Sequence, residues 1–471
     1  MSEQTPSYLA GHLAPVQDET EATGLHVTGA LPSELTGRYF RNGPNPLPGE
    51  DSGHWFAGHG MLHGVRLENG RAAWYRNRWV RTRRLDGARP IGPDGIRDLA
   101  AGAANTSVIQ HAGRILALME TSHPYELSPE LDTLGPCDFG GRLTTGMTAH
   151  PKEDPCTGEL HLFDYGVRPP YLTYHRLTAD GELATSFPVE VPGPTMMHDF
   201  AITPHHIVWL DLPVVLDPDL VGRGVPYRWS DSYTARIGLM GRNDPAVRWF
   251  DIEPCYVFHV GNAHEDDRGR VVLDAVRYGP DAWRAAWARA GGPPGPGQAA
   301  AAGVSSLHRW TLDPATGTVT EQALDDTGVE FPTLDDRLVG LPHRYLYAVD
   351  SHAIVKVDSE HGLVARHDLG ADWHAGEAVF VPAAGSTGGS LSGSTGGSTG
   401  GSTGGSAAGS TGEDEGWLLS IVTHRSPSVP SRLLVHDATD LAAGPVATVH
   451  LPRRVPAGFH GTWIPDTEPH R

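Results

Sequence analysis

The amino-acid sequence predicts an all-β protein, and three observations lead to this fold class. Glycine (58 residues) and proline (39 residues) are abundant among the 471 residues, whereas long helical patterns are few. Apolar residues make up 39% of the chain, a normal content for a globular protein with a buried core. Turn sequences that contain Asp and Gly recur between short β-rich runs, which is typical of antiparallel hairpins.

The clearest hairpin is predicted near the beginning of the chain. Residues 53–67 end in an alternating pattern that indicates a strand, and residues 72–81 indicate a second strand. The two are separated by Glu68, Asn69 and Gly70, and Asn-Gly between two such runs is a strong hairpin signal.

Further turns follow at intervals of some tens of residues. They occupy residues 154–158, 180–181, 267–269 and 313–317, and they separate β-rich runs such as 160–165 and 271–278. Asp supplies local hydrogen bonds and Gly supplies the positive φ that tight turns need. Repeated hairpins favour a β-propeller, although a β-sandwich satisfies the same pattern.

Two segments interrupt this rhythm. Residues 280–290 predict a helix with Asp281 near its cap and with Trp283 and Trp287 one turn apart. Residues 385–412 are almost entirely Gly, Ser and Thr, a composition that predicts a disordered surface insertion. Because a strand is predicted to resume at residues 417–423, we expect residues 1–471 to form a single domain that contains this insertion.

Charge and cysteine content exclude several classes of protein. The formal net charge is −20 and only two lysines occur, so binding to nucleic acid is not expected. Cys137, Cys156 and Cys255 are too few for a disulfide framework, which favours the reducing cytoplasm. Neither a signal peptide nor a membrane-spanning apolar stretch is recognisable.

Four histidines share one sequence context, the end of a short apolar run. They are His150 in G-M-T-A-H-P-K, His198 in P-T-M-M-H-D-F, His259 in C-Y-V-F-H-V-G-N-A and His460 in A-G-F-H-G-T-W. Neutral imidazole is a good ligand for iron, zinc, copper and nickel. Because the intervals between them are 48, 61 and 201 residues, no single helix or hairpin can supply all four. They can meet only if each lies on a different strand directed at a common axis, as in the central channel of a propeller.

Nine segments of the chain, in order, carry a family resemblance. They read R-N-G-P-N-P, W-F-A-G-H-G-M-L-H, A-N-T, T-A-H-P-K, M-M-H-D-F, F-H-V-G-N-A, E-F-P, G-E-A-V-F-V-P and F-H-G-T-W, between about Leu31 and Trp463. With these segments the sequence resembles the carotenoid cleavage oxygenases, whose relatives include the lignostilbene dioxygenases and the retinoid isomerohydrolase. The resemblance implies a seven-bladed β-propeller with a cap of loops and short helices. It also implies one Fe(II) ion per chain, held by the four histidines named above.

The same resemblance assigns roles to four further residues. Glu120, Glu330 and Glu377 match family glutamates behind the histidines, where a carboxylate that accepts the outer imidazole N–H fixes the tautomer and raises the basicity of the ring. Thr106, in A-N-T, matches a threonine near the open coordination face, with an ordinary strand residue as the alternative. For other histidines we expect hydrogen-bonding roles: His54, His59, His63, His161, His264 and His308.

The chemistry implied by the resemblance is oxidative cleavage of a carbon–carbon double bond by O₂, which yields two carbonyl products. The sequence contains no phosphate-binding glycine loop and no G-x-S-x-G elbow, so neither a nucleotide nor a serine nucleophile is expected. The stilbene cleavers of the family have a Tyr and a Lys that engage the substrate phenol. Here Met119 occupies the lysine position and no lysine precedes Lys152. This departure favours a carotenoid or apocarotenoid over a stilbene.

A long polyene resides in membranes, so peripheral membrane contact is one expectation. Trp283, Trp287 and the apolar segment from Leu212 to Val221 are candidates, with simple packing on the propeller as the alternative. Three other functions remain open. They are lignostilbene-type cleavage or oxygen-independent isomerisation at the same site, a non-enzymatic interaction scaffold, and a zinc hydrolase, which is disfavoured because four histidines leave no carboxylate as ligand or base.

Overall fold

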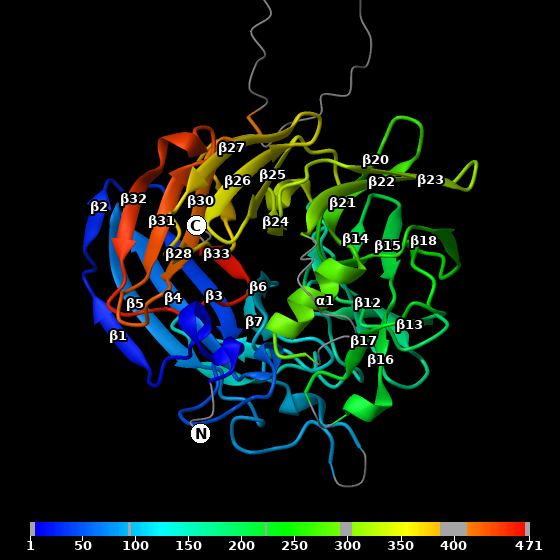
Figure 1. Cartoon of the computed structure of the whole chain (residues 1–471), viewed down its shortest axis with the longest axis horizontal. Coiled ribbons are helices and arrows are strands. Elements are labelled where there is room, and N and C mark those ends of the chain that lie inside the picture. The colour runs from blue at the N-terminus through cyan, green and yellow to red at the C-terminus, as the bar shows by residue number, and fades with distance from the viewer. Residues whose placement is uncertain (1–4, 93–95, 222–223, 293–303, 387–411, 467–471) are drawn as a thin grey trace, which may run out of the picture.

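Seven β-sheets are arranged as blades around a central axis, and one further two-stranded hairpin is inserted, so the protein is a seven-bladed β-propeller (Figure 1). The computed structural model describes residues 5–92, 96–221, 224–292, 304–386 and 412–466. The predicted all-β propeller is therefore confirmed, and the sandwich is excluded. Most of the predicted Gly/Ser/Thr-rich insertion (385–412) lies outside the described residues, so its disorder stays a prediction.

Five blades are four-stranded sheets that follow one another along the chain. The first two contain β6 (Ser107–His111), β7 (Arg114–Leu118), β8 (Tyr125–Leu127) and β9 (Thr133–Pro136), then β10 (Lys152–Glu153), β11 (Leu160–Tyr165), β12 (Leu172–Leu177) and β13 (Leu183–Val189). The third contains β14 (Ala201–Ile202), β15 (His206–Asp211), β18 (Arg236–Gly241) and β19 (Val247–Asp251), with the separate hairpin β16 (Val214–Leu216) and β17 (Tyr227–Trp229) inserted. The fourth and fifth contain β20 (Tyr256–Glu265), β21 (Val271–Tyr278), β22 (Ser306–Asp313) and β23 (Thr318–Ala323), then β24 (Glu330–Thr333), β25 (Tyr345–Val349), β26 (Ala353–Asp358) and β27 (Gly362–Asp368).

The remaining two blades combine strands from both ends of the chain. One contains β1 (Thr20–Thr23), β3 (Gly37–Pro44), β4 (Gly60–Glu68), β5 (Arg71–Trp79) and β33 (Gly461–Pro465). The other contains β2 (Val27–Gly29), β28 (Trp373–His374), β29 (Val379–Pro382), β30 (Gly416–His424), β31 (Arg432–Asp437) and β32 (Pro445–His450). Pairing of β3 with β33 and of β2 with β32 closes the ring, because each pair joins a strand near the beginning of the chain to a strand near its end.

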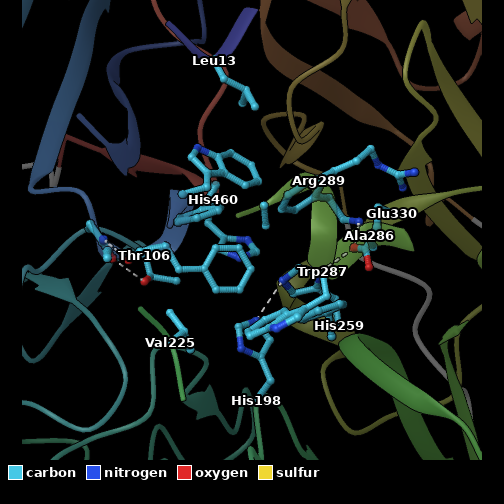
Figure 2. A pocket seen from close by; sticks show the side chains of 18 of the residues that line it. Leu13, Thr106, His198, Val225, His259, Ala286, Trp287, Arg289, Glu330 and His460 are labelled. Atoms are coloured by element: carbon cyan, nitrogen blue, oxygen red, sulfur yellow. Dashed lines mark hydrogen bonds and ion pairs between the residues drawn. The ribbon is translucent and has the colours of Figure 1, made fainter. Parts of the chain in front are cut away.

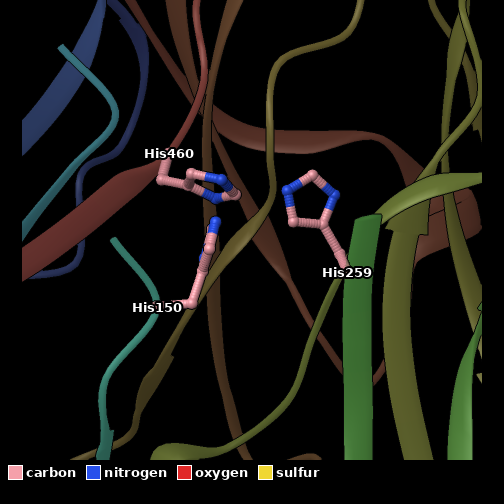
Figure 3. Close-up of side chains that lie close together, drawn as sticks. All are labelled: His150, His259 and His460. Atoms are coloured by element: carbon pink, nitrogen blue, oxygen red, sulfur yellow. The ribbon is translucent and has the colours of Figure 1, made fainter. Parts of the chain in front are cut away.

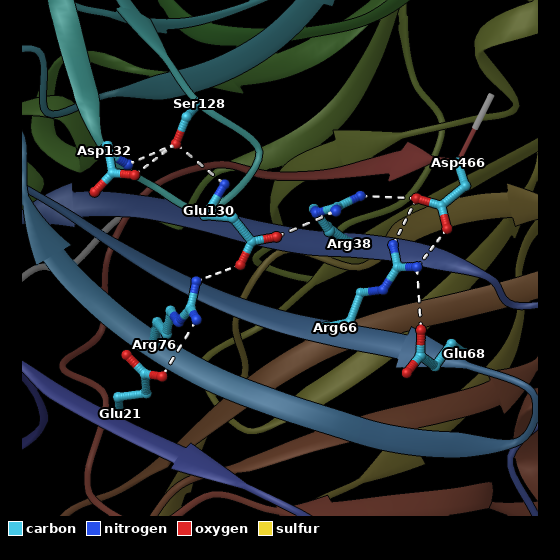
Figure 4. Close-up of polar contacts among 9 residues, drawn as sticks. All are labelled: Glu21, Arg38, Arg66, Glu68, Arg76, Ser128, Glu130, Asp132 and Asp466. Carbon is cyan, nitrogen blue, oxygen red and sulfur yellow. Dashed lines mark hydrogen bonds and ion pairs between the residues drawn. The ribbon is translucent and has the colours of Figure 1, made fainter. Parts of the chain in front are cut away.

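An ion-pair network reinforces this closure (Figure 4). Asp466, directly after β33, contacts Arg38 of β3 at 2.7 Å and Arg66 of β4 at 2.5 Å. Glu130, from the turn between β8 and β9, contacts both Arg38 and Arg76 and so connects the next blade. Individual half-exposed pairs contribute little, but a connected network holds the C-terminal strand in register.

Local turn chemistry behaves as the sequence predicts. Asn69 and Gly70 have φ values of 50° and 72° and join β4 to β5, as a tight hairpin turn with a positive φ at both central residues requires. Strands β11 and β21 coincide with the predicted runs 160–165 and 271–278. The local sequence is therefore sufficient to predict where this turn and these two strands lie.

Aromatic packing between neighbouring sheets holds the blades at fixed angles. Phe163 of β11 meets Phe200 and Trp209 of the following blade, with ring centroids 5.1 Å and 5.6 Å away. All three side chains are fully buried, and such rings contribute large apolar areas to a core. The inner loops are therefore carried on a rigid frame.

The one α-helix in the described part of the chain is α1 (Pro280–Arg289), which confirms the predicted helix. Trp283 and Trp287 stack on each other, and each is 2% exposed, packed against the propeller and its loops. The prediction that these two tryptophans contact a membrane is therefore wrong. An apolar helix face can pack equally well on lipid or on protein, and in the folded chain this face packs on protein. Leu212 and Val214 are buried too, whereas Val221 is 53% exposed. No helix within the described residues is both long and apolar enough to traverse a bilayer.

Candidate metal centre and substrate cavity

One histidine or glutamate from each blade meets at the propeller axis. His150 precedes β10, His198 precedes β14, His259 is on β20 and His460 precedes β33. Glu120 follows β7, Glu330 begins β24 and Glu377 precedes β29. His150 and His460 are 310 positions apart in the chain, yet their ring centroids lie 4.7 Å apart because the inner ends of the blades converge.

The four imidazoles converge through their ring nitrogens. His150, His259 and His460 each offer one nitrogen, and these three nitrogens lie within 4.8 Å of one another (Figure 3). The Nε2 atom of His198 lies 3.1 Å from that of His150 and 3.4 Å from that of His259. Two imidazole nitrogens at about 2.1 Å from one ion and at right angles to each other are about 3 Å apart. The two distances measured from His198 therefore fit adjacent ligands of one divalent transition metal.

Three carboxylates orient three of these imidazoles from behind. Nδ1 of His259 lies 2.5 Å from Glu330, and Nδ1 of His460 lies 2.9 Å from Glu377. Nδ1 of His198 lies 2.5 Å from Glu120, in a charge contact rather than an aligned hydrogen bond. A carboxylate at Nδ1 holds the proton there and leaves the Nε2 lone pair directed at the axis.

Burial and charge set the protonation of this cluster. Burial, followed by the neighbouring imidazoles, lowers the pKa of His150 well below its usual value. Burial also lowers the pKa of His259, against the opposing effect of Glu330. For His198 burial is again the largest single effect and lowers the pKa, but the carboxylates of Glu120, Asp199 and Glu330 together outweigh it, and the pKa is raised. Two of the rings are thus held neutral, the state in which imidazole binds a metal.

A cavity of about 980 Å³ opens onto this centre (Figure 2). His198, His259 and His460 line it, and so do residues of α1, including Trp287. Its aromatic wall is formed by Trp55, Phe56, Phe258, Phe331 and Phe459. A volume at the upper end of the usual range for ligand sites, with apolar walls, suits a long hydrocarbon.

Comparison with known proteins agrees with this geometry. Residues 13–465 match the family described as retinal pigment epithelial membrane protein (RPE65). The chain is 39% identical to a carotenoid cleavage oxygenase from Mycobacterium tuberculosis, over 99% of each chain. Among solved structures it is similar to the lignostilbene dioxygenase of Pseudomonas brassicacearum (27% identity, TM-score 0.81, 99% and 100% of the two chains). It is also similar to the cobalt-substituted apocarotenoid oxygenase of Synechocystis (27% identity, TM-score 0.77, 96% and 97%).

The chain belongs to the carotenoid cleavage oxygenase family. Its relatives are oxygenases and dioxygenases, so this member is an enzyme of the dioxygenase class. The cobalt-containing relative also indicates that a metal centre belongs to the fold.

Thr106 lies on the wall of the cavity of this oxygenase. Its hydroxyl donates a 2.9 Å hydrogen bond to Asn105, whose amide in turn donates to the carbonyls of Phe56 and Gly58. The backbone N–H of His460 donates to the Thr106 carbonyl at 3.3 Å. Thr106 is therefore held rigidly beside one imidazole, and its role at the open coordination face stays a prediction.

The other conspicuous histidines have structural contacts. His63 and His161 hydrogen-bond to Tyr75 and Tyr174 at 2.9 Å and 2.7 Å, and His59 contacts Glu50 at 3.2 Å. The remaining three cap a turn or pack against side chains, namely His54, His264 and His308. None of these six belongs to the axial cluster in the described chain.

Several site residues escape sequence reasoning. Tyr165 donates to Glu120 at 2.9 Å and Tyr278 donates to Glu330 at 2.8 Å, so two of the orienting carboxylates are themselves held. Phe331 follows Glu330 with a φ of 53° and stacks on His259 at 4.9 Å. Such backbone strain concentrates at functional sites, but no short-range pattern announces it.

Proposed function

We propose that this protein is a non-haem Fe(II) dioxygenase that cleaves one carbon–carbon double bond of a carotenoid or apocarotenoid. One alkene and one O₂ would give two carbonyl compounds, with both oxygen atoms retained and no reductant consumed. The observation that carries the proposal is the convergence of four imidazoles at the end of an apolar cavity.

The proposed ion is Fe(II), one per chain, with His150, His198, His259 and His460 as its ligands. When bound, Fe(II) supplies the O₂ chemistry that the side chains lack. Four histidine ligands would leave part of the coordination sphere of the ion open for this purpose. The glutamates Glu120, Glu330 and Glu377 keep the imidazole lone pairs aimed at the ion.

The remaining cavity residues bind and orient the polyene. The walls contributed by Phe258, Phe331 and Trp287 exclude water and hold one double bond against the centre. Glu120 and Glu330 also line the cavity, but each is engaged by a histidine and a tyrosine. The proposal therefore assigns no general acid or base.

The choice of a polyene over a phenolic stilbene rests on the cavity wall. Met119 lines the cavity at the position where stilbene cleavers resemble one another in a lysine, and no lysine is among the described residues that line it. Two of the three tyrosines that line the cavity, Tyr165 and Tyr278, donate their hydroxyl hydrogens to glutamates; the third is Tyr227. Lignostilbene cleavage is the second candidate, because a lignostilbene dioxygenase is among the similar structures.

We place the reaction in the cytoplasm with uptake of substrate from a membrane surface. Val221 and Ile91 are 53% and 54% exposed, and each lies close in sequence to a cavity-lining residue, Gly224 and Pro90. Exposed apolar side chains next to cavity-lining segments favour contact with lipid. Vesicle flotation of the full chain, with Val221→Ser and Ile91→Ser together as the test variant, measures this contact. Equal flotation of variant and wild type rejects it.

The test of the function is product analysis of anaerobically purified, iron-analysed protein. A panel of carotenoids, apocarotenoids and phenolic stilbenes is incubated under ¹⁸O₂, and products are read by mass. We expect labelled aldehydes or ketones from polyenes, about one iron per chain, and loss of both iron and turnover in His198→Ala. Faster cleavage of a stilbene than of every polyene rejects the substrate, and turnover without a transition metal rejects the proposal.

A further inference from the structure

A buried carboxylate connects three of the histidine-bearing segments. Asp199, which directly follows His198, is 2% exposed. Its Oδ1 atom lies 2.8 Å from the Lys152 ammonium and also accepts the backbone N–H of Phe200 at 2.8 Å. Its Oδ2 atom accepts the backbone N–H of Val260 at 2.8 Å.

The partners of Asp199 are adjacent in sequence to the other imidazoles. Lys152 lies two residues after His150, and Val260 lies one residue after His259. The three segments belong to three consecutive blades, and no strand pairing joins those blades to one another in the described chain. The contacts of Asp199 therefore cross two blade boundaries where the sheets themselves make no backbone hydrogen bonds.

The charge of Asp199 suits this task better than a neutral side chain. Its carboxylate accepts three hydrogen bonds, one of them from a cation, whereas Asn at this position has a single acceptor oxygen. Lys152 is 20% exposed at its side chain, so the pair is largely shielded from water. Removal of one member of such a pair leaves an uncompensated charge, which strongly favours local rearrangement.

We infer that Asp199 is a positioning residue of the metal centre, acting with Lys152 to fix the spacing of His150, His198 and His259. The inference rests on the proposed iron site and concerns how that site is held. A metal site tolerates errors of only about 0.2 Å in its ligand distances, so a contact that locks three ligand segments together raises metal affinity. Glu120 and Glu330 orient individual rings, and Asp199 sets the distances between the backbones that carry them.

The test is titration of the metal-free full chain with Co²⁺, followed by its visible ligand-field spectrum and by thermal unfolding of the metal-free form. The variants are Asp199→Asn, Lys152→Met, the double variant, and Lys152→Arg as the conservative replacement. Asp274→Asn is the matched control, because Asp274 forms a similarly buried pair with Arg309 (2.7 Å) inside one blade and a second contact with His343 of the next blade (3.3 Å), away from Lys152. His198→Ala reports on the metal centre itself.

We expect Asp199→Asn and Lys152→Met each to weaken Co²⁺ binding by about 10-fold to 100-fold and to change the spectrum. The double variant should bind no more weakly than the worse single variant, since the two residues act as one contact. Lys152→Arg should retain most of the wild-type Co²⁺ affinity. Asp274→Asn should keep the wild-type spectrum even if its melting temperature is lower.

Two results overturn the inference while the metal centre stands. One is wild-type affinity and spectrum in Asp199→Asn, provided that His198→Ala has lost binding. The other is an equal loss in Asp274→Asn, which would trace the effect to general loosening of the blades. Failure of the wild type to bind Co²⁺, or equal binding by His198→Ala, instead overturns the proposed centre and this inference with it.

Discussion

Replacement of Glu330 separates the charge of an orienting carboxylate from its hydrogen bonds. The carboxylate accepts from His259 at 2.5 Å, from the backbone N–H of Phe331 at 2.6 Å and from the Tyr278 hydroxyl at 2.8 Å. The first two donors share Oε2, and the tyrosine alone uses Oε1. A glutamine can therefore place its carbonyl oxygen at the Oε2 position while the tyrosine hydroxyl rotates to accept from the amide.

The expected magnitudes follow from this geometry. Glu330→Gln keeps the contacts but loses the ionic contribution, and bonds to charged groups exceed neutral ones by about 1 kcal/mol each. Summed over the hydrogen bond to His259 and the two neighbouring bonds, the loss is about 1–3 kcal/mol, which corresponds to about a 5-fold to 150-fold loss of metal affinity. Glu330→Ala leaves three hydrogen-bond donors without an acceptor, so the loss of free energy is larger, at about 1–3 kcal/mol for each buried donor.

Anaerobic equilibrium titration with Fe²⁺ or Co²⁺ measures these affinities, and kcat is measured at saturating metal. Glu265→Gln is the matched control, because Glu265 lies at the end of the same strand as His259 and accepts from His205 and His206. We expect the order wild type, Glu265→Gln, Glu330→Gln, Glu330→Ala, with the first two nearly equal. Wild-type affinity in Glu330→Ala would refute the claim that this carboxylate orients a ligand.

Three further predictions concern stability. Burial raises the pKa of the Asp164 carboxyl to about 6, against the opposing charge of Arg97. The folded protein therefore holds this proton more tightly than the unfolded chain, and the free energy of unfolding falls as pH rises from about 4 to 6. Asp164→Asn should therefore raise the free energy of unfolding at pH 8 by up to ~3 kcal/mol and change it little at pH 4, as measured by urea denaturation. Lys356 is 5% exposed, and its ammonium donates a 2.6 Å hydrogen bond to Asp414, which links two blades. Lys356→Met should lower the free energy of unfolding by about 3–5 kcal/mol, because it leaves the Asp414 carboxylate buried without its cation. An unchanged denaturation midpoint would contradict this. Free metal at a hundredfold excess over its Kd should stabilise the fold by about 3 kcal/mol, so chelation should lower Tm in the wild type but not in His198→Ala.

Short-range chemistry decided much of what the sequence predicts correctly. The Asn69-Gly70 turn, strands β11 and β21, and the helix α1 depend on side-chain alternation and on residues that accept positive φ. Such signals act over a few residues, so they survive into the folded protein. These short-range signals are the same in a β-sandwich and in a β-propeller, so they do not distinguish the two folds. Only the family resemblance predicts that the propeller has seven blades.

The candidate site shows a similar division. The histidines and glutamates could be named from their motifs, whereas Tyr165, Tyr278 and Phe331 carry no motif and became visible only through their contacts. The tryptophans of α1 are the opposite case. Their spacing predicts one face of a helix, which the structure confirms. Whether that face is buried depends on the surface that packs against it, which the spacing does not specify.

The amino-acid sequence by itself determined the strand and turn repertoire, the acidic character and the chemical identity of the side chains that are proposed to bind the metal, because these are properties of single residues and their near neighbours. Only the tertiary structure decided that β3 pairs with β33, that residues 150 and 460 share one axis, and that Lys152 reaches Asp199. Those outcomes require the ring to close, and ring closure is a property of the whole chain that no local segment encodes.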